Sequence, residues 1–149
     1  MTTIAATLDA LAGDRMVTDG SSATWYPAVK VRRIKGAVIG AAGDAGDATR
    51  LMDWAEHGFA EKKRPKFLLA AGDEDAAVML VLTADGIHIM STSDPYPEKI
   101  ADGTYAIGSG GKAAWAALLA GRSLEEAMQA AYNCDPYTRP PFDILPLKE

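Results

Sequence analysis

The chain has 149 residues, 48% of them hydrophobic, which is typical of one soluble globular domain with a substantial core, and its net charge of −5 argues against a nucleic-acid partner. Its apolar runs are too short to cross a bilayer and its first residues lack a signal-peptide pattern, so we expect no membrane partner and a cytoplasmic protein. The single cysteine, Cys134, excludes an internal disulfide and is expected to be a small buried hydrophobe.

The first part of the chain reads as two hairpins followed by a helix. Residues 2–6 and 11–20 are apolar, β-branched stretches on either side of a turn, and they predict the first hairpin. Residues 28–34 alternate in polarity, and residues 35–43 return as a buried partner strand. From residue 44 to about residue 61, apolar side chains recur at helical spacing, which predicts one amphipathic helix.

The second part of the chain reads as a third hairpin, two helices and a last strand. Residues 76–83 and 86–92 flank an Ala-Asp-Gly turn, a Pro-rich loop covers 93–103, and Tyr105–Ile107 predicts a short strand. Helices are predicted over 112–120 and, after a capping box at Ser123, over 124–133, with a final strand at 142–147. Because strands and helices do not alternate regularly, this order favours a single α+β layered domain over residues 1–149 rather than a doubly wound nucleotide fold.

A glycine-rich loop, "YAIGSGGKAAW", precedes the first of these two helices and raises the possibility of a phosphate site. A Walker A loop needs a glycine where this chain has Ala106 and a hydroxyl where it has Ala113, and the dinucleotide spacing is absent as well. The stretch is therefore better explained as a tight turn from strand to helix.

The sequence begins Met-Thr-Thr-Ile, and removal of Met1 would leave Thr2 with both a hydroxyl and a free α-amine. Such an amine, with a pKa of about 7.7–8.0, is partly neutral near neutral pH and can accept the hydroxyl proton. Thr2 is thus a candidate nucleophile that carries its own base, and retention of Met1 would block it.

Six short stretches occur in order along nearly the whole chain: TTIAAT, AGDRMVTDG, VKVRRI, AVIGAAGD, YAIGSGG and CDPYT. Together they resemble the N-terminal nucleophile (Ntn) peptidases: bacterial HslV, proteasome β subunits and compact proteasome-like proteins of bacteria and phages. The resemblance implies a four-layer αββα sandwich. Because the chain lacks the second long helix of longer members, the first helical layer should be reduced, and this puts their ATPase docking face in doubt.

The resemblance also implies roles for individual residues around Thr2, which looks like the nucleophile. Lys30 matches a buried lysine whose charge favours the threonine alkoxide. Asp14 matches the aspartate that holds this lysine, with Asp19 as the alternative partner. Gly40 matches the glycine whose backbone N–H binds the oxyanion.

Further positions follow from the same resemblance. Ser109 matches the serine that hydrogen-bonds the N-terminal amine, and Asp135 and Thr138 match residues that close the site. Thr18 and Ala41 would line the substrate cleft. No cofactor is required, although Tyr132, Asp135 and Thr138 match a bend that binds a structural Na⁺ or Mg²⁺/Ca²⁺ ion in HslV-like members.

The function implied is a threonine endopeptidase of the HslV/proteasome type, acting on peptides or unfolded proteins inside a ring of identical subunits. The alternative is a catalytically inactive, self-assembling protein of the same fold, encoded by a phage. His57 and His88 have no part in either scheme and are expected to be ordinary surface or core residues.

Overall fold

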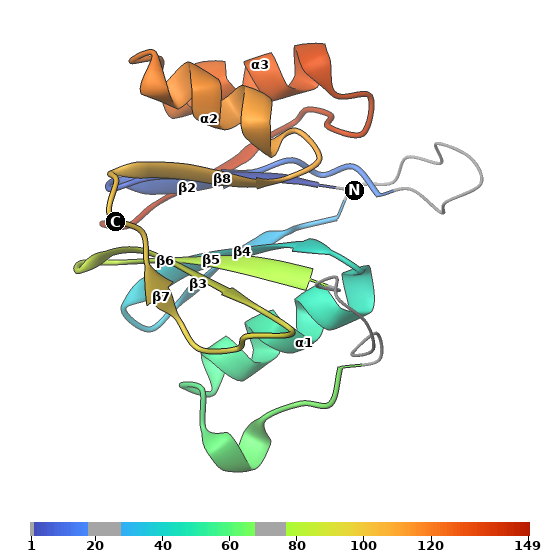
Figure 1. Cartoon of the computed structure of the whole chain (residues 1–149), viewed down its shortest axis with the longest axis vertical. Helices are drawn as coiled ribbons and strands as arrows, with labels where there is room; N and C mark the ends of the chain where they lie inside the picture. The colour runs from blue at the N-terminus through green and yellow to red at the C-terminus, as the bar shows by residue number, and fades with distance from the viewer. Residues whose placement is uncertain (1, 18–27, 68–76) are drawn as a thin grey trace.

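The computed structural model describes residues 2–17, 28–67 and 77–149, and these residues form two stacked antiparallel sheets with helices on both outer sides (Figure 1). The first sheet has the strand order β8-β1-β2-β9 and the second the order β3-β4-β5-β6-β7. The α+β class and the four αββα layers predicted above are therefore confirmed.

The strands of the first sheet come from both ends of the chain: β1 (Thr3–Thr7), β2 (Ala10–Gly13), β8 (Thr104–Gly108) and β9 (Asp143–Pro146). The second sheet comes from the middle: β3 (Val31–Ile34), β4 (Ala37–Gly43), β5 (Ala77–Thr83), β6 (Gly86–Ser91) and β7 (Glu98–Lys99). Strand β7 lies within the stretch predicted to be a loop, where it pairs with two residues of β6.

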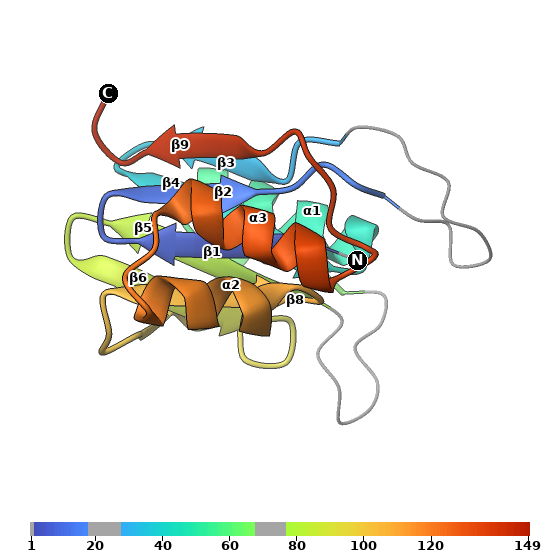
Figure 2. The same cartoon turned by 90° about the horizontal axis from the view of Figure 1, so that it is seen from above.

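Two helices, α2 (Gly111–Leu119) and α3 (Leu124–Cys134), lie side by side across the first sheet (Figure 2). Helix α1 (Ala45–Glu56) and the short 3-10 helix η1 (Glu61–Lys63) are the helices described on the other side of the sandwich. This thin layer agrees with the predicted reduction. None of the described helices is long and apolar enough to cross a membrane.

Helix α1 ends earlier than its apolar spacing predicts. The chain reverses at Gly58 and Phe59, which have positive φ angles of 69° and 57°. Their N–H groups donate to the carbonyls of Ala55 and Trp54, which satisfies the end of the helix. Phe59 then packs edge-on against Trp54, with 5.3 Å between the ring centroids, so it keeps its apolar contact without being helical.

Side chains of β1 alternate between two cores, and this alternation sets up the site. Ile4 and Ala6 pack between the sheets, whereas Thr3 and Ala5 face the α2–α3 layer. Thr2 precedes the strand on the same side as Ile4, toward the second sheet. Cys134, the last residue of α3, is exposed; the prediction that it is buried was wrong, because it lies beyond Ala131, the last buried residue of that helix.

Candidate active site

A cavity of about 300 Å³ lies beside Thr2, between β4, the start of α1 and the segments that flank β2 and β3. Most of its wall is apolar, with Lys30 and Asp44 as its charged members. The lining residues are Thr2, Met16, Val17, Ala28, Val29, Lys30, Ala41, Gly43, Asp44, Ala45, Ala48, Thr49 and Met52. Thr2 itself is 6% exposed, so a substrate would reach it by way of this cavity.

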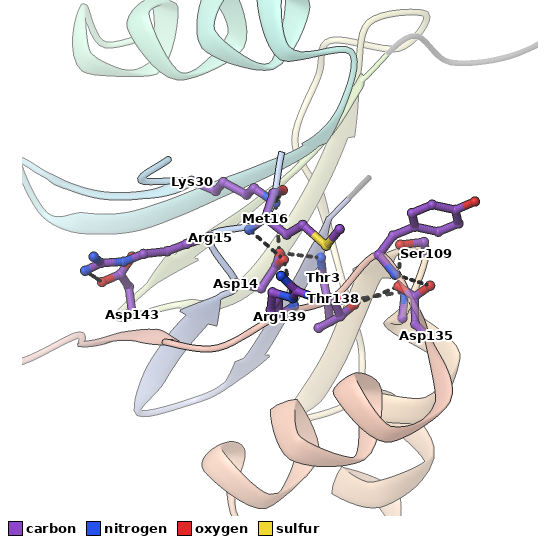
Figure 3. Close-up of polar contacts among 12 residues, drawn as sticks. Thr3, Asp14, Arg15, Met16, Lys30, Ser109, Asp135, Thr138, Arg139 and Asp143 are labelled. Atoms are coloured by element: carbon purple, nitrogen blue, oxygen red, sulfur yellow. Dashed lines mark hydrogen bonds and ion pairs between the residues drawn. The ribbon is translucent and has the colours of Figure 1, made fainter. Parts of the chain in front are cut away.

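A buried ion pair joins Asp14 to Lys30, as the resemblance implied (Figure 3). The Asp14 carboxylate accepts Lys30 Nζ and the N–H of Thr3, each at 3.0 Å, on one oxygen. Its other oxygen accepts the N–H groups of Met16 at 3.1 Å and Arg139 at 3.3 Å. Four donors therefore fix this carboxylate, while Asp19 lies outside the described residues.

Lys30 is held from two sides. Its ammonium donates to Asp14 and also to the carbonyl oxygen of Met16. Burial lowers the pKa of Lys30 below its ordinary value, and the attraction of Asp14 offsets only part of this effect. A cation next to Thr2 with a lowered pKa can both stabilise an alkoxide and exchange a proton more readily than an exposed lysine.

The glycine-rich turn lies against the backbone of Thr2. The N–H of Ser109 donates to the carbonyl oxygen of Thr2 at 2.8 Å. This contact depends on Gly108, which has a φ of 94° and where an added Cβ would lie 1.8 Å from that same oxygen. The turn is thus shaped to hold Thr2 and not to bind phosphate.

Asp135 caps the end of α3 and gathers hydroxyl groups around one oxygen, Oδ2. Ser109 Oγ donates to it at 2.6 Å and Thr138 Oγ1 at 2.7 Å, while the N–H of Tyr137 donates to the other oxygen at 3.2 Å. Burial alone would raise the pKa of Asp135, but these hydrogen bonds outweigh it and place the pKa below its ordinary value. The structure thus brings Ser109, Asp135 and Thr138 together, and Asp135 is ionised at neutral pH.

Gly40 does not fit its predicted role as oxyanion donor. Its Cα faces the other sheet, where an added Cβ would come within 2.9 Å of Ile4 and 3.0 Å of Leu11, so close packing explains the glycine. The N–H of the next residue, Ala41, donates to the Lys30 carbonyl in the direction of β3. Because N–H groups alternate along a strand, that of Gly40 points to its partner Leu80 in β5, away from the cavity.

The backbone N–H of Gly43 points in the direction that an oxyanion donor needs, which that of Gly40 does not. Gly43 lies two residues beyond Ala41 on β4, so its N–H points to the β3 side, past the point where β3 begins. Gly43 lines the cavity and has a φ of 115°, a conformation that requires glycine. Sequence reasoning missed this residue, although the second glycine of "AVIGAAGD" was the available signal.

Thr3 is a second residue that sequence reasoning missed. It is fully buried, its N–H donates to Asp14, and its hydroxyl lies 2.6 Å from that of Thr138 and 3.1 Å from the N–H of Gly110. The signal in the sequence is a second threonine directly after Thr2, on the face where a buried strand would otherwise carry an apolar residue.

The other predicted binding residues have different outcomes. Ala41 lines the cavity, whereas Thr18 lies outside the described residues. At the bend, both carboxylate oxygens of Asp135 accept protein donors, and its backbone carbonyl accepts the N–H of Thr138 at 3.3 Å. Within the described part of the chain, no cluster of three or more His, Cys, Asp or Glu residues could hold a metal ion. The predicted ion at Tyr132, Asp135 and Thr138 would instead be bound by backbone carbonyls, and it stays a prediction.

A scan of protein-family models finds no match to this chain. A search of curated proteins finds none either. Solved structures do match: HslV from Trypanosoma brucei is 28% identical, with a TM-score of 0.74 over 97% of this chain and 98% of its own. BPH from Thiobacillus denitrificans is 17% identical, with a TM-score of 0.73 over 99% of each chain, and its complex with epoxomicin is 16% identical, with a TM-score of 0.69.

Proposed function

We propose that this chain, which has the proteasome-type Ntn-hydrolase fold, is a threonine peptidase whose nucleophile is Thr2 after removal of Met1. The likeness to HslV and BPH supports the fold. The observation that carries the activity is the buried Asp14–Lys30 ion pair, whose lysine lines the same cavity as Thr2. A buried lysine paired with a carboxylate that accepts four hydrogen bonds adds little to the stability of a strand end. Its charge does, however, favour ionisation of a neighbouring hydroxyl.

The proposed reaction proceeds through an ester intermediate. Thr2 Oγ attacks the carbonyl carbon of a peptide bond while the Thr2 α-amine accepts the hydroxyl proton. The resulting oxyanion collapses, the C–N bond breaks, and the amine passes its proton to the leaving amino group. The same amine then deprotonates a water molecule, which attacks the ester and releases the acid, and the proton returns to Thr2 Oγ.

Residues around Thr2 assist each stage. Lys30 stabilises the developing alkoxide, and Ser109 with Asp135 orients the free amine. We assign the oxyanion donor to the N–H of Gly43 rather than Gly40, because the strand directs it to the cavity. The cavity itself would receive the substrate side chain before the cleaved bond, and its methionine and alanine walls favour an apolar one.

The proposal includes an assembly of identical subunits around peptide or unfolded-protein substrates. The likeness to HslV and BPH supports this assembly. An ATPase partner has no such support, because the helical layer formed by α1 and η1 is thin in the described residues.

Intact-mass spectrometry with an epoxyketone probe tests the proposal. We expect a protein mass that lacks Met1 and one probe molecule bound per chain. Thr2→Ala should bind no probe and should unfold at the same temperature as the unchanged protein, because it removes the hydroxyl and keeps the fold.

A mass that includes Met1, with no probe adduct, would contradict the peptidase and favour a non-catalytic, self-assembling protein of this fold. In that case Thr2→Ala should leave the function unchanged, and substitutions at subunit contacts should abolish it.

A further inference from the structure

The backbone of Thr3 is fixed to the ion pair that serves Thr2. Its N–H donates to Asp14 at 3.0 Å, and its carbonyl accepts the N–H of Asp14 at 3.2 Å. Asp14 in turn binds Lys30 at 3.0 Å. Any shift of Thr3 along β1 would therefore move Thr2 relative to Lys30, since Thr2 and Thr3 share a peptide bond.

The side chain of Thr3 leads, on the opposite face of the strand, to the group around Asp135. The Gly110 N–H donates to Thr3 Oγ1 at 3.1 Å, and Thr3 Oγ1 lies 2.6 Å from Thr138 Oγ1. Thr138 has a single hydroxyl proton and donates it to the Asp135 carboxylate at 2.7 Å. The proton between the two threonines must therefore come from Thr3.

These three hydrogen bonds form one series in which every donor points the same way, from the Gly110 N–H through Thr3 and Thr138 to Asp135. Ser109 donates to the same carboxylate oxygen from the other side, at 2.6 Å. Hydrogen bonds that are aligned in this way strengthen one another, and they fix the position of each member. This series of hydrogen bonds ends at Asp135 and Ser109, the pair that, under the proposed function, orients the amine of Thr2.

We infer, resting on the proposed peptidase, that Thr3 is a positioning residue that aligns both halves of the site at once. Its amide fixes the Asp14–Lys30 pair, and its hydroxyl orders the path through Thr138 to Asp135 and Ser109. Thr3 does not touch the substrate. It sets the distance between the Thr2 hydroxyl and Lys30 on one side, and between the Thr2 amine and Ser109 on the other.

The close packing around the Thr3 hydroxyl indicates that this position needs a hydroxyl group in a fixed place, and not only a side chain of the same size. An added Cβ at Gly110 would lie 2.3 Å from Thr3 Oγ1 and 2.8 Å from Thr138 Oγ1. Valine would match the shape of Thr3, but it can neither accept the Gly110 N–H nor donate to Thr138. Serine would keep both hydrogen bonds and lose one methyl group.

The test compares Thr3→Val with Thr3→Ser, using hydrolysis of a short fluorogenic peptide with an apolar residue before the cleaved bond. For Thr3→Val we expect kcat to fall by about a hundredfold with little change in KM, because misplacement by about 1 Å costs roughly that factor. Thr3→Ser should keep most of the rate. A residue with only a structural role would lower stability without this split between kcat and KM.

Thr7 provides a matched control. It lies on the same strand, and its hydroxyl accepts the N–H groups of Asp9 at 3.2 Å and Ala10 at 3.3 Å in the turn that ends β1. Thr7→Val also removes a threonine hydroxyl that accepts backbone N–H groups. We expect it to lower stability and leave kcat unchanged.

Thr138→Val and Thr138→Ser interrupt or keep the same chain one step further along, and they serve as the test if Thr3→Val does not fold. Combined with Thr3→Val, Thr138→Val should cause less than the product of the two separate losses, since both break one path. If the unchanged protein hydrolyses the peptide and Thr3→Val or Thr138→Val does so equally fast, the inference about Thr3 is overturned and the proposed function is not. An unchanged, processed protein without activity would overturn the proposed function and the inference with it.

Discussion

Gly108 leaves no room for a side chain next to Thr2. The loss of stability when a side chain is added there can be compared with the loss at a second glycine, Gly36. Both Gly108 and Gly36 have positive φ angles, 94° and 76°, but an added Cβ would meet nothing within 4 Å at Gly36 and the Thr2 oxygen at 1.8 Å at Gly108. Gly36→Ala should therefore destabilise the protein by about 1–2 kcal/mol, the cost of the backbone conformation alone. Gly108→Ala should cost more and should also displace Ser109, which chemical unfolding and the probe reaction would show. Equal costs would contradict the close contact.

Lys30 makes stability depend on pH in a direction that can be worked out. Because folding lowers its pKa from the ordinary value of 10.5, the unfolded chain binds more protons between the two pKa values. Stability should therefore rise with pH across this interval, by at most about 1.4 kcal/mol per pH unit. Urea unfolding of the unchanged protein and of Lys30→Met at several alkaline pH values tests this. The variant should lack this part of the slope, although it is less stable overall, and identical slopes would rule out a lowered pKa.

At the scale of single residues, the resemblance predicted the buried Asp14–Lys30 pair, which local patterns could not. Lys30 and Asp135 come from distant parts of the chain, and nothing near them in sequence marks either as buried. The prediction that the Gly40 N–H binds the oxyanion was wrong because of the strand register. A two-residue turn sets the β3–β4 register, so Ala41 pairs with Lys30, and a shift by one residue reverses the direction of every N–H. The sequence does mark this turn, at Lys35 and Gly36, so the error came from matching Gly40 by its motif and not by the direction of its N–H.

At the scale of elements, the predictions were most accurate where local signals are strong. Helices α2 and α3 begin and end within one residue of their predicted bounds, since a capping box and glycines mark them. The end of α1 was predicted too late because Phe59 keeps the apolar spacing after the helix has stopped. Strand β7 could not be predicted from its own residues, Glu98 and Lys99, because it exists only through pairing with β6.

At the scale of the whole molecule, exposed apolar side chains are consistent with the proposed subunit assembly. Leu119 of α2 is 60% exposed, and Tyr132 and Tyr137, at and after the end of α3, are 42% and 38% exposed. Light scattering during size-exclusion chromatography should give a multiple of the chain mass, with the probe-reactive species in the same peak. A probe-reactive monomer would contradict the assembly and leave the peptidase intact.

The first sheet joins the two ends of the chain, and this has a consequence for the time before folding is complete. Thr2 directly precedes β1 and Asp14 directly follows β2, but the neighbouring strands β8 and β9 are made only after residue 103. Ser109 and Asp135, which complete the site, are synthesised in that same late stretch. Under the proposed function, a chain still being made on the ribosome thus has its nucleophile, Thr2, with no finished site around it. Under the proposed function, the order of the strands would by itself delay peptidase activity until β8, α3 and β9 have been made, without a separate inhibitor.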